Sequence, residues 1–281
     1  MTESMQALSA SPLKNLHGWE QNLVPGLVSI VMPTYNCENS LSASIRSVQA
    51  QTCRDWELVI VDDASSDASL EIARRFAIED KRIRVLPLSQ NGGAARARNA
   101  AINAARGQYL AFLDSDDLWL PQKLAVQVEF LKSHNAGFCF GSYCRWNGAD
   151  QISAPVPVPQ TVQYSNLLCG NVIPCLTVLL DRERIASFRM PQTPHEDYAA
   201  WLAILRQGHT AYGMQIDLAR YRVSPQSLSA NKFKCALWHW QILRAQEKLR
   251  LPRAIWCFLR YALRGILIRG TKTPRLASAT G

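Results

Sequence analysis

The sequence predicts an α/β fold, with a Rossmann-like, mostly parallel sheet flanked by helices. Short apolar runs alternate with amphipathic segments from residue 27 to residue 143, which is the βαβ pattern of a doubly wound sheet. Acidic residues directly follow two of these runs, at 62–63 and 114–117, and ligands bind at such strand ends in open α/β sheets. A basic C-terminal segment predicts a helical extension beyond the sheet.

The elements of the first half follow from the spacing of apolar residues. Continuous apolar runs predict strands, which we place at 27–32 (ended by Pro33), 56–61, 83–86, 109–113 and 136–143. Helical spacing predicts helices at 40–51, around 70–76, from the Asn91-Gly92-Gly93 turn to Ala105 with Gly107 as C-cap, and at 123–132. Right-handed crossovers would bring the ends of the first, second and fourth strands to one edge of the sheet.

The second half begins after a proline-rich connector at 154–160, which cannot be helical. We expect a strand at 175–180, a helix from 195–197 to about 207 and a loop at 221–229. The domain plan is therefore a lead-in (1–26), a sheet domain (27–230, with halves 27–150 and 160–230) and a tail (231–281).

Charge and cysteine usage limit the class of protein. Lys232 to Gly281 holds eleven Lys and Arg and one acid, a charge of +10, so the other residues sum to −1 of the total +9. The lead-in has no apolar core of a secretory signal, and we see no run long enough to cross a bilayer. The eight cysteines form no Cys-x-x-Cys pair, so we expect reduced thiols in the cytosol.

The stretch 109–117 is the one around which the other candidate site residues are arranged. A short buried strand ends in Asp114, Asp116 and Asp117, and clustered carboxylates suit a hard cation such as Mg²⁺ or Mn²⁺. The alternative is that Asp116 or Asp117 caps a helix beginning near Pro121.

Five motifs in order resemble the family 2 inverting glycosyltransferases with the GT-A fold, and the resemblance covers about residues 26–230. They are Val28 to Asn36, Val61 to Asp67, Ala97-Arg98-Asn99, Leu113 to Asp117 and His195-Glu196-Asp197. The processive members carry a Gln-x-x-Arg-Trp motif and membrane spans. This sequence has neither, which favours addition of a single sugar.

The resemblance implies a nucleotide-sugar site in the first half. Asp63 would accept the N3–H of uracil while Tyr35 stacks on the ring, and the backbone of Pro33 and Thr34 would shape the pocket. Asp63 could instead be a turn residue. Arg98 would contact the donor or its phosphate, or would pair with one of the acids.

The same resemblance places a divalent cation, Mn²⁺ or Mg²⁺, on Asp116. Asp114 would lie near the ribose or bind the same ion, and Ser115 belongs to this donor-binding stretch. Asp117 would be a cap or a supporting group. Arg222 could hold the diphosphate.

Asp197 is the candidate general base that takes the proton of the acceptor hydroxyl. Glu196 is the alternative base or an orienter of the acceptor. Both would also suit a helix N-terminus as first-turn acids. His195 would contact the acceptor or serve a structural role.

The tail has apolar residues at helical spacing from Ile255 to Leu267, with arginines on the other face. Such a helix can lie on an anionic membrane, here through 232–275, or can pack on the catalytic domain. We expect no nucleic-acid partner, because no binding motif accompanies the charge.

Together these features predict a metal-dependent transferase. It would move a sugar from a nucleotide donor, most simply a UDP-sugar, to a polysaccharide or lipid-linked acceptor at the inner face of the plasma membrane. The rivals are a sugar-nucleotide nucleotidyltransferase, for which the glycine-rich loop after the first strand is missing, and a non-catalytic nucleotide-binding module.

Overall fold

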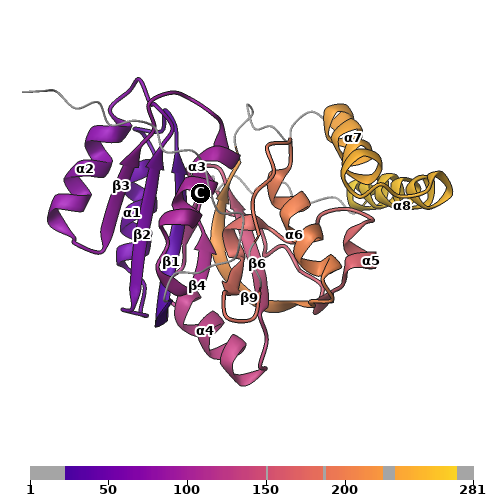
Figure 1. The fold of residues 1–281 in the computed structure, drawn as a ribbon, viewed down its shortest axis with the longest axis horizontal. Coiled ribbons are helices and arrows are strands. Elements are labelled where there is room, and N and C mark those ends of the chain that lie inside the picture. The colour runs from indigo at the N-terminus through magenta and orange to yellow at the C-terminus, as the bar shows by residue number, and fades with distance from the viewer. Residues whose placement is uncertain (1–22, 150, 186–187, 224–231, 271–281) are drawn as a thin grey trace, which may run out of the picture.

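A computed structural model describes residues 23–149, 151–185, 188–223 and 232–270. In the last of these parts, only the side chains of residues 233–264 are described. The predicted lead-in therefore lies almost wholly outside the described residues, as do 224–229 of the predicted loop and the end of the tail. Within the described parts, the strands form one central sheet with helices on both faces (Figure 1).

The first half of the sheet is parallel. Its order is β3-β2-β1-β4, formed by β1 (Val24–Thr34), β2 (Trp56–Asp62), β3 (Ile83–Pro87) and β4 (Gly107–Phe112). β1 pairs with β2 and β4, and β2 pairs with β3, all in parallel register. The alternation of strands and crossover helices in the sequence predicts this arrangement.

The second half continues the sheet in the order β8-β6-β9-β5 and is mixed. It contains β5 (Leu118–Trp119), β6 (Phe138–Trp146), β7 (Thr161–Val162), β8 (Leu179–Asp181) and β9 (Ala211–Arg222). β8 runs antiparallel to both β4 and β6, and β6 and β9 are parallel. β5 and β7 each pair antiparallel with β9.

Alternate residues of the strands bury against helices on opposite faces, as the pleat of a strand requires. On one face, Ile30 and Ile60 belong to a core with α1 (Leu41–Gln49), α2 (Ser69–Glu79) and α4 (Lys123–Ser133). On the other, Val31 and Val59 belong to a core with α3 (Ala94–Ala104) and α6 (Glu196–Arg206). α3 therefore packs in the same core as β2 and β4, the two strands that end in the acidic motifs.

The tail forms α7 (Lys232–Gln241), a π-helical turn (Ile242–Gln246) and α8 (Leu251–Gly270) beside α6 and α5 (Tyr164–Leu167) (Figure 1). Ile242, Leu243, Ala254 and Cys257 are buried in the core that also contains α6. Part of the tail therefore packs on the sheet domain, which is the alternative that the sequence left open.

Four local predictions were wrong. β1 continues through Pro33 to Thr34, and Gly107 starts β4 instead of capping a helix. A Cβ at Gly107 would lie 2.4 Å from the Leu27 carbonyl oxygen, so the close approach of two strands requires this glycine. A 3₁₀ turn (Cys175–Thr177) shortens the strand expected at 175–180, and Tyr221 and Arg222 end β9 instead of opening a loop.

No helix in the described part of the chain is both long and apolar enough to cross a membrane. None of the eight cysteines, all of which lie in the described residues, forms a disulfide.

Candidate active site

The ends of β1, β2 and β4 meet at one edge of the sheet, as the sequence predicts. Thr34 and Asp62 are aligned across β1 and β2, and the Asp63 N–H donates to the Thr34 carbonyl at 2.8 Å. The Leu113 N–H donates to the carbonyl of Val31 at 3.0 Å. The segments 34–36, 62–63 and 114–117 therefore lie along this edge.

Asp63 holds the turn that begins α3. Its carboxylate accepts the N–H of Gly92 at 2.9 Å and the N–H of Gly93 at 2.7 Å, and the side chain is buried. The buried hydroxyl of Thr34 has no hydrogen-bond partner among the described residues, and Tyr35, the next residue in the sequence, is half exposed. Asp63 therefore does stabilise a turn, as one of the two alternatives expected. The Thr34 hydroxyl at the adjacent strand end still lacks a hydrogen-bond partner.

Arg98, on the second turn of α3, joins two acids from distant parts of the chain. One guanidinium nitrogen donates to Asp114 at 2.5 Å, and another donates to Glu196. Burial alone would lower the pKa of this guanidinium, but the neighbouring carboxylates raise it above its ordinary value. Arg98 is thus a fixed cation between the end of β4 and the start of α6, and the predicted alternative of an ion pair holds for two acids at once.

Asp197 lies in the first turn of α6, next to Glu196, after His195 adopts a left-handed conformation with φ 57°. Its carboxylate accepts a hydrogen bond from the Asn171 side chain at 3.1 Å. Burial and the Glu196 carboxylate raise the pKa of Asp197. Asp197 is therefore an oriented carboxylate with raised proton affinity, the properties that a general base needs.

The acidic loop after β4 is held by β9. The Asp117 carboxylate accepts the backbone N–H of Arg222 at 2.8 Å, and the Arg222 guanidinium donates to the Asp116 carbonyl at 3.1 Å. β5 follows this loop and α4 begins only at Lys123, so the alternative of Asp116 or Asp117 as a helix cap was wrong. Ser115 is fixed through its carbonyl, which accepts the Ser44 hydroxyl at 2.9 Å.

The acidic loop fits a divalent cation that takes most of its ligands from a bound phosphate. Burial and neighbouring carboxylates raise the pKa of Asp116 and of Asp117, and one Asp117 oxygen is buried without a partner. Among the described residues, no group of three or more His, Cys, Asp or Glu side chains has a metal-binding arrangement. One or two carboxylates plus phosphate oxygens and water is the usual set for Mg²⁺, and Asp114 and Asp116 can supply those carboxylates.

A cavity of about 1130 Å³ joins these groups to the tail. Arg98, Asp114, Asp117, Glu196 and Asp197 line one part of it. The remaining wall comes from Tyr143, Arg145, 156–159, 169–176, 194–195, Tyr221 and the two tail helices. Of the predicted site residues, Pro33, Thr34, Tyr35, Asp63, Ser115 and Asp116 do not line this cavity.

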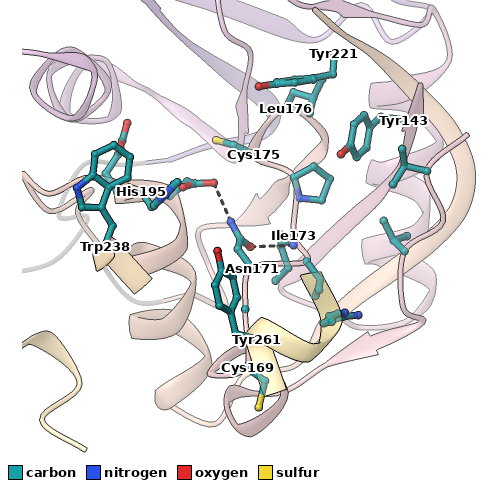
Figure 2. A pocket seen from close by; sticks show the side chains of 18 of the residues that line it. Tyr143, Cys169, Asn171, Ile173, Cys175, Leu176, His195, Tyr221, Trp238 and Tyr261 are labelled. Atoms are coloured by element: carbon teal, nitrogen blue, oxygen red, sulfur yellow. Dashed lines mark hydrogen bonds between the residues drawn. The ribbon is translucent and has the colours of Figure 1, made fainter. Parts of the chain in front are cut away.

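Figure 2 shows Asn171 in the middle of the cavity, with its amide hydrogen-bonded toward the start of α6. His195 and Trp238 lie on one side in this view, with ring centroids 5.1 Å apart, and Tyr143 and Tyr221 lie on the other. Tyr261 of α8 also faces this space. The local sequence did not predict that Asn171, Trp238 and Tyr261 line this cavity, because that placement arises from contacts between separate segments; Trp238 and Tyr261 were expected only as interfacial aromatics of the tail.

Comparison with known proteins gives concordant results. The family model described as Glycosyl transferase family 2 matches residues 29–171. The chain is 40% identical to the putative teichuronic acid biosynthesis glycosyltransferase TuaG of Bacillus subtilis over 84% of this chain and 94% of TuaG. It is also 40% identical to the Escherichia coli enzyme named UDP-Glc:alpha-D-GlcNAc-diphosphoundecaprenol beta-1,3-glucosyltransferase WfgD, over 85% of this chain and 94% of WfgD.

Solved structures share the fold at low sequence identity. Staphylococcus aureus TarS 1–349 in complex with UDP-GlcNAc has a TM-score of 0.66 at 18% identity, covering 86% of this chain and 73% of that chain. The mannosyltransferase PcManGT from Pyrobaculum calidifontis, solved with GDP-Man and Mn²⁺, has a TM-score of 0.62 at 18% identity, covering 89% and 77%.

Proposed function

The chain belongs to glycosyl transferase family 2 and is a glycosyltransferase, and from this premise we propose that it transfers one sugar from a UDP-sugar to a lipid-linked glycan acceptor with inversion at the anomeric carbon. The observation that carries the proposal is the Arg98 bridge. It holds Asp114, at the predicted donor end, against Glu196, the neighbour of the proposed base.

We assign the donor to the carboxyl edge of β1, β2 and β4, within the proposed half 27–150. Tyr35 would stack on the base, and Asp63 would accept its N3–H through lone pairs that the 92–93 turn leaves free. Pro33, Thr34 and Ser115 would shape the pocket by backbone contacts. The name of WfgD, which is 40% identical to this chain and is named for UDP-Glc, supports a uridine donor, and TarS, which shares the fold, was solved with UDP and with UDP-GlcNAc.

We assign the acceptor to the part of the cavity between α6 and the tail, which residues of the proposed half 160–230 and of α7 and α8 line. The acceptor hydroxyl would lie at Asp197, which Asn171 orients. Its oxygen forms a bond to the anomeric carbon and the carbon–diphosphate bond breaks, with the electron pair leaving on the nucleoside diphosphate. The hydroxyl proton passes to Asp197, and a single displacement of this kind inverts configuration.

Asp114 and Asp116 are the residues that would hold Mn²⁺ or Mg²⁺. When bound, the cation neutralises negative charge on the departing diphosphate. Arg98 holds one oxygen of Asp114 in place for this role. Arg222 is already committed to the acidic loop, so we propose that it positions this loop and no longer assign it to the diphosphate.

The names of the relatives support an acceptor in surface-glycan synthesis. WfgD is named for transfer to a GlcNAc-diphosphoundecaprenol and TuaG for teichuronic acid biosynthesis. We therefore propose a lipid diphosphate acceptor that is met at the cytoplasmic face of the plasma membrane, with UDP-glucose as the first donor to test.

The test is to incubate the full chain with UDP-glucose, UDP-GlcNAc or GDP-mannose, a synthetic GlcNAc-diphosphate lipid, and Mn²⁺, Mg²⁺ or a chelator. We expect release of UDP with the matching donor, its loss with chelator, and a product of inverted configuration by NMR. A separate reaction with UTP and glucose 1-phosphate tests the rival enzyme class, because release of pyrophosphate from that pair would instead indicate a nucleotidyltransferase. Binding of UDP without turnover would indicate a binding module.

The proposed base has a matched control. Asp197→Asn keeps the size of the side chain and can still contact Asn171, but it cannot accept the proton, so we expect turnover to fall by about 10²–10⁴-fold. Asp80→Asn removes a carboxylate that pairs with Arg82 away from the cavity and should leave turnover unchanged. Equal turnover of the two variants would refute the role of Asp197.

A further inference from the structure

Apolar side chains gather on the outer side of the tail. Of the thirteen large apolar side chains that are exposed in the described residues, seven lie on α7 and α8. Five of these are on α8, each between 43% and 61% exposed: Leu251, Ile255, Trp256, Leu259 and Leu263. Four of the five recur every fourth residue, which places them along one side of the helix.

This stripe is separate from the side of α8 that packs on the domain. Ala254 and Cys257 are buried in the core, and Phe258 and Tyr261 line the cavity. The helix therefore has two apolar sides. One is used by the fold, and the other has no contact in the described structure that would explain it.

Positive charge borders the exposed stripe. Arg253, Arg260 and Arg264 are exposed on α8, and the Arg260 guanidinium lies 5.8 Å from the ring centroid of Trp256. The one acid between 232 and 281 is Glu247, whose side chain is buried and pairs with Tyr164 and Arg206. No carboxylate of the tail therefore offsets the arginines at its outer surface.

We propose that the outer side of α8, defined as Leu251, Ile255, Trp256, Leu259, Leu263 and the flanking Arg253 and Arg260, docks on an anionic bilayer surface. An exposed apolar stripe with interfacial aromatics and bordering arginines fits a helix that lies in the plane of the headgroups. The charge complementarity selects an anionic lipid surface over a neutral protein partner.

Docking in this way would bring the acceptor cavity to within the width of one helix from the bilayer. One α-helix separates the outer side of α8 from the cavity side that carries Phe258, Tyr261 and Ala262, and a helix is about 10 Å across. A sugar on a lipid diphosphate could then reach Asp197 while its hydrocarbon chain stays in the membrane. This consequence rests on the proposed function, whereas the docking itself does not.

The experiment is co-sedimentation of the full chain with vesicles of phosphatidylglycerol and phosphatidylcholine, compared with phosphatidylcholine alone. We expect pelleting with the anionic vesicles and release by added salt. Arg253→Gln with Arg260→Gln should weaken binding roughly thirtyfold. Leu259→Glu with Leu263→Glu should abolish it.

The matched control lies on α2, at the opposite end of the molecule (Figure 1). Arg74→Gln with Ile78→Glu changes an exposed arginine and an apolar residue that is 73% exposed, and it should leave vesicle binding unchanged. Circular dichroism and the thermal midpoint of each variant verify that it is folded. All the substituted residues are exposed and lie outside the cavity.

Two results would overturn the proposal. One is equal pelleting of the wild type and both α8 variants. The other is a wild-type dimer that the leucine pair disperses, with no binding to anionic vesicles, which would assign this side to a second copy of the chain. UDP release in solution is measured in parallel, so vesicle binding without turnover would refute the proposed function and leave the docking side standing.

Discussion

Replacing Arg98 with methionine tests whether one cation holds the two halves of the site together. Arg98, Glu196 and Asp114 have side chains that are 8%, 19% and 33% exposed. Removing one partner of a buried ion pair costs about 3–5 kcal/mol because the other charge remains buried. Solvent screens Asp114 in part, so we expect the lower end, a loss of about 3 kcal/mol in the free energy of unfolding.

For a chain of this size, about 3 kcal/mol corresponds to a fall of roughly 6–12 °C in the thermal midpoint, which differential scanning calorimetry at neutral pH can measure. Arg75→Met is the control, since Arg75 and its partner Glu71 are 66% and 79% exposed and such surface pairs contribute little. Adding Glu196→Gln to Arg98→Met should recover part of the loss, because one of the two unpaired carboxylates is then neutral. A midpoint for Arg98→Met equal to that of Arg75→Met would refute the reasoning.

Three further variants test other parts of the structure. Glu196→Gln should move the acidic limb of the pH–rate profile to lower pH. Burial and the Glu196 carboxylate raise the pKa of Asp197, and removing the neighbouring charge lowers that pKa, so the base stays ionised to a lower pH. An acidic limb at the same pH as in the wild type would contradict this. Gly107→Ala should lower stability by about 1–3 kcal/mol in urea titrations, because its Cβ would meet the Leu27 carbonyl; an unchanged midpoint would show that the strands can separate at no cost. Burial lowers the pKa of Lys123 from 10.5 to about 7. At pH values between these two, the unfolded chain binds more protons than the folded chain, so the free energy of unfolding of the wild type should rise with pH. Lys123→Met should lack that rise when thermal midpoints are measured across the same pH range.

The parallel half of the sheet was predictable because β1, β2 and β4 contain short apolar runs that are buried on both faces. A strand of this kind can be recognised from its own residues, without knowledge of the strands with which it pairs. β9 was missed for the opposite reason. It is long, carries Asp217 and Arg220 as an internal ion pair, and pairs with β6 through shifts of register, so its strand character comes from its neighbours and not from its own pattern.

The same distinction applies to the site. The acids of the predicted site stand at strand ends and a helix start, where local pattern places them. The Asn171 contact to Asp197, and the cavity wall formed by Trp238 and Tyr261, join segments whose approach no local pattern fixes. The tail was predicted as an amphipathic helix, but the sequence could not separate the apolar side that packs on the domain from the side that stays exposed.

The order of these walls along the chain has a consequence for how such genes can be recombined. Tyr35, Asp63 and Asp116 are encoded before the proline-rich connector, and the segments 169–176 and 236–264 that close the cavity are encoded after it. One crossover in the connector would exchange the second set and leave the first untouched. The two parent proteins would need compatible residues in the contacts that join the two sets. These are chiefly the ion pair of Arg98 with Glu196, the hydrogen bond between Asp117 and Arg222, and the pairing of β8 with β4 and of β9 with β6.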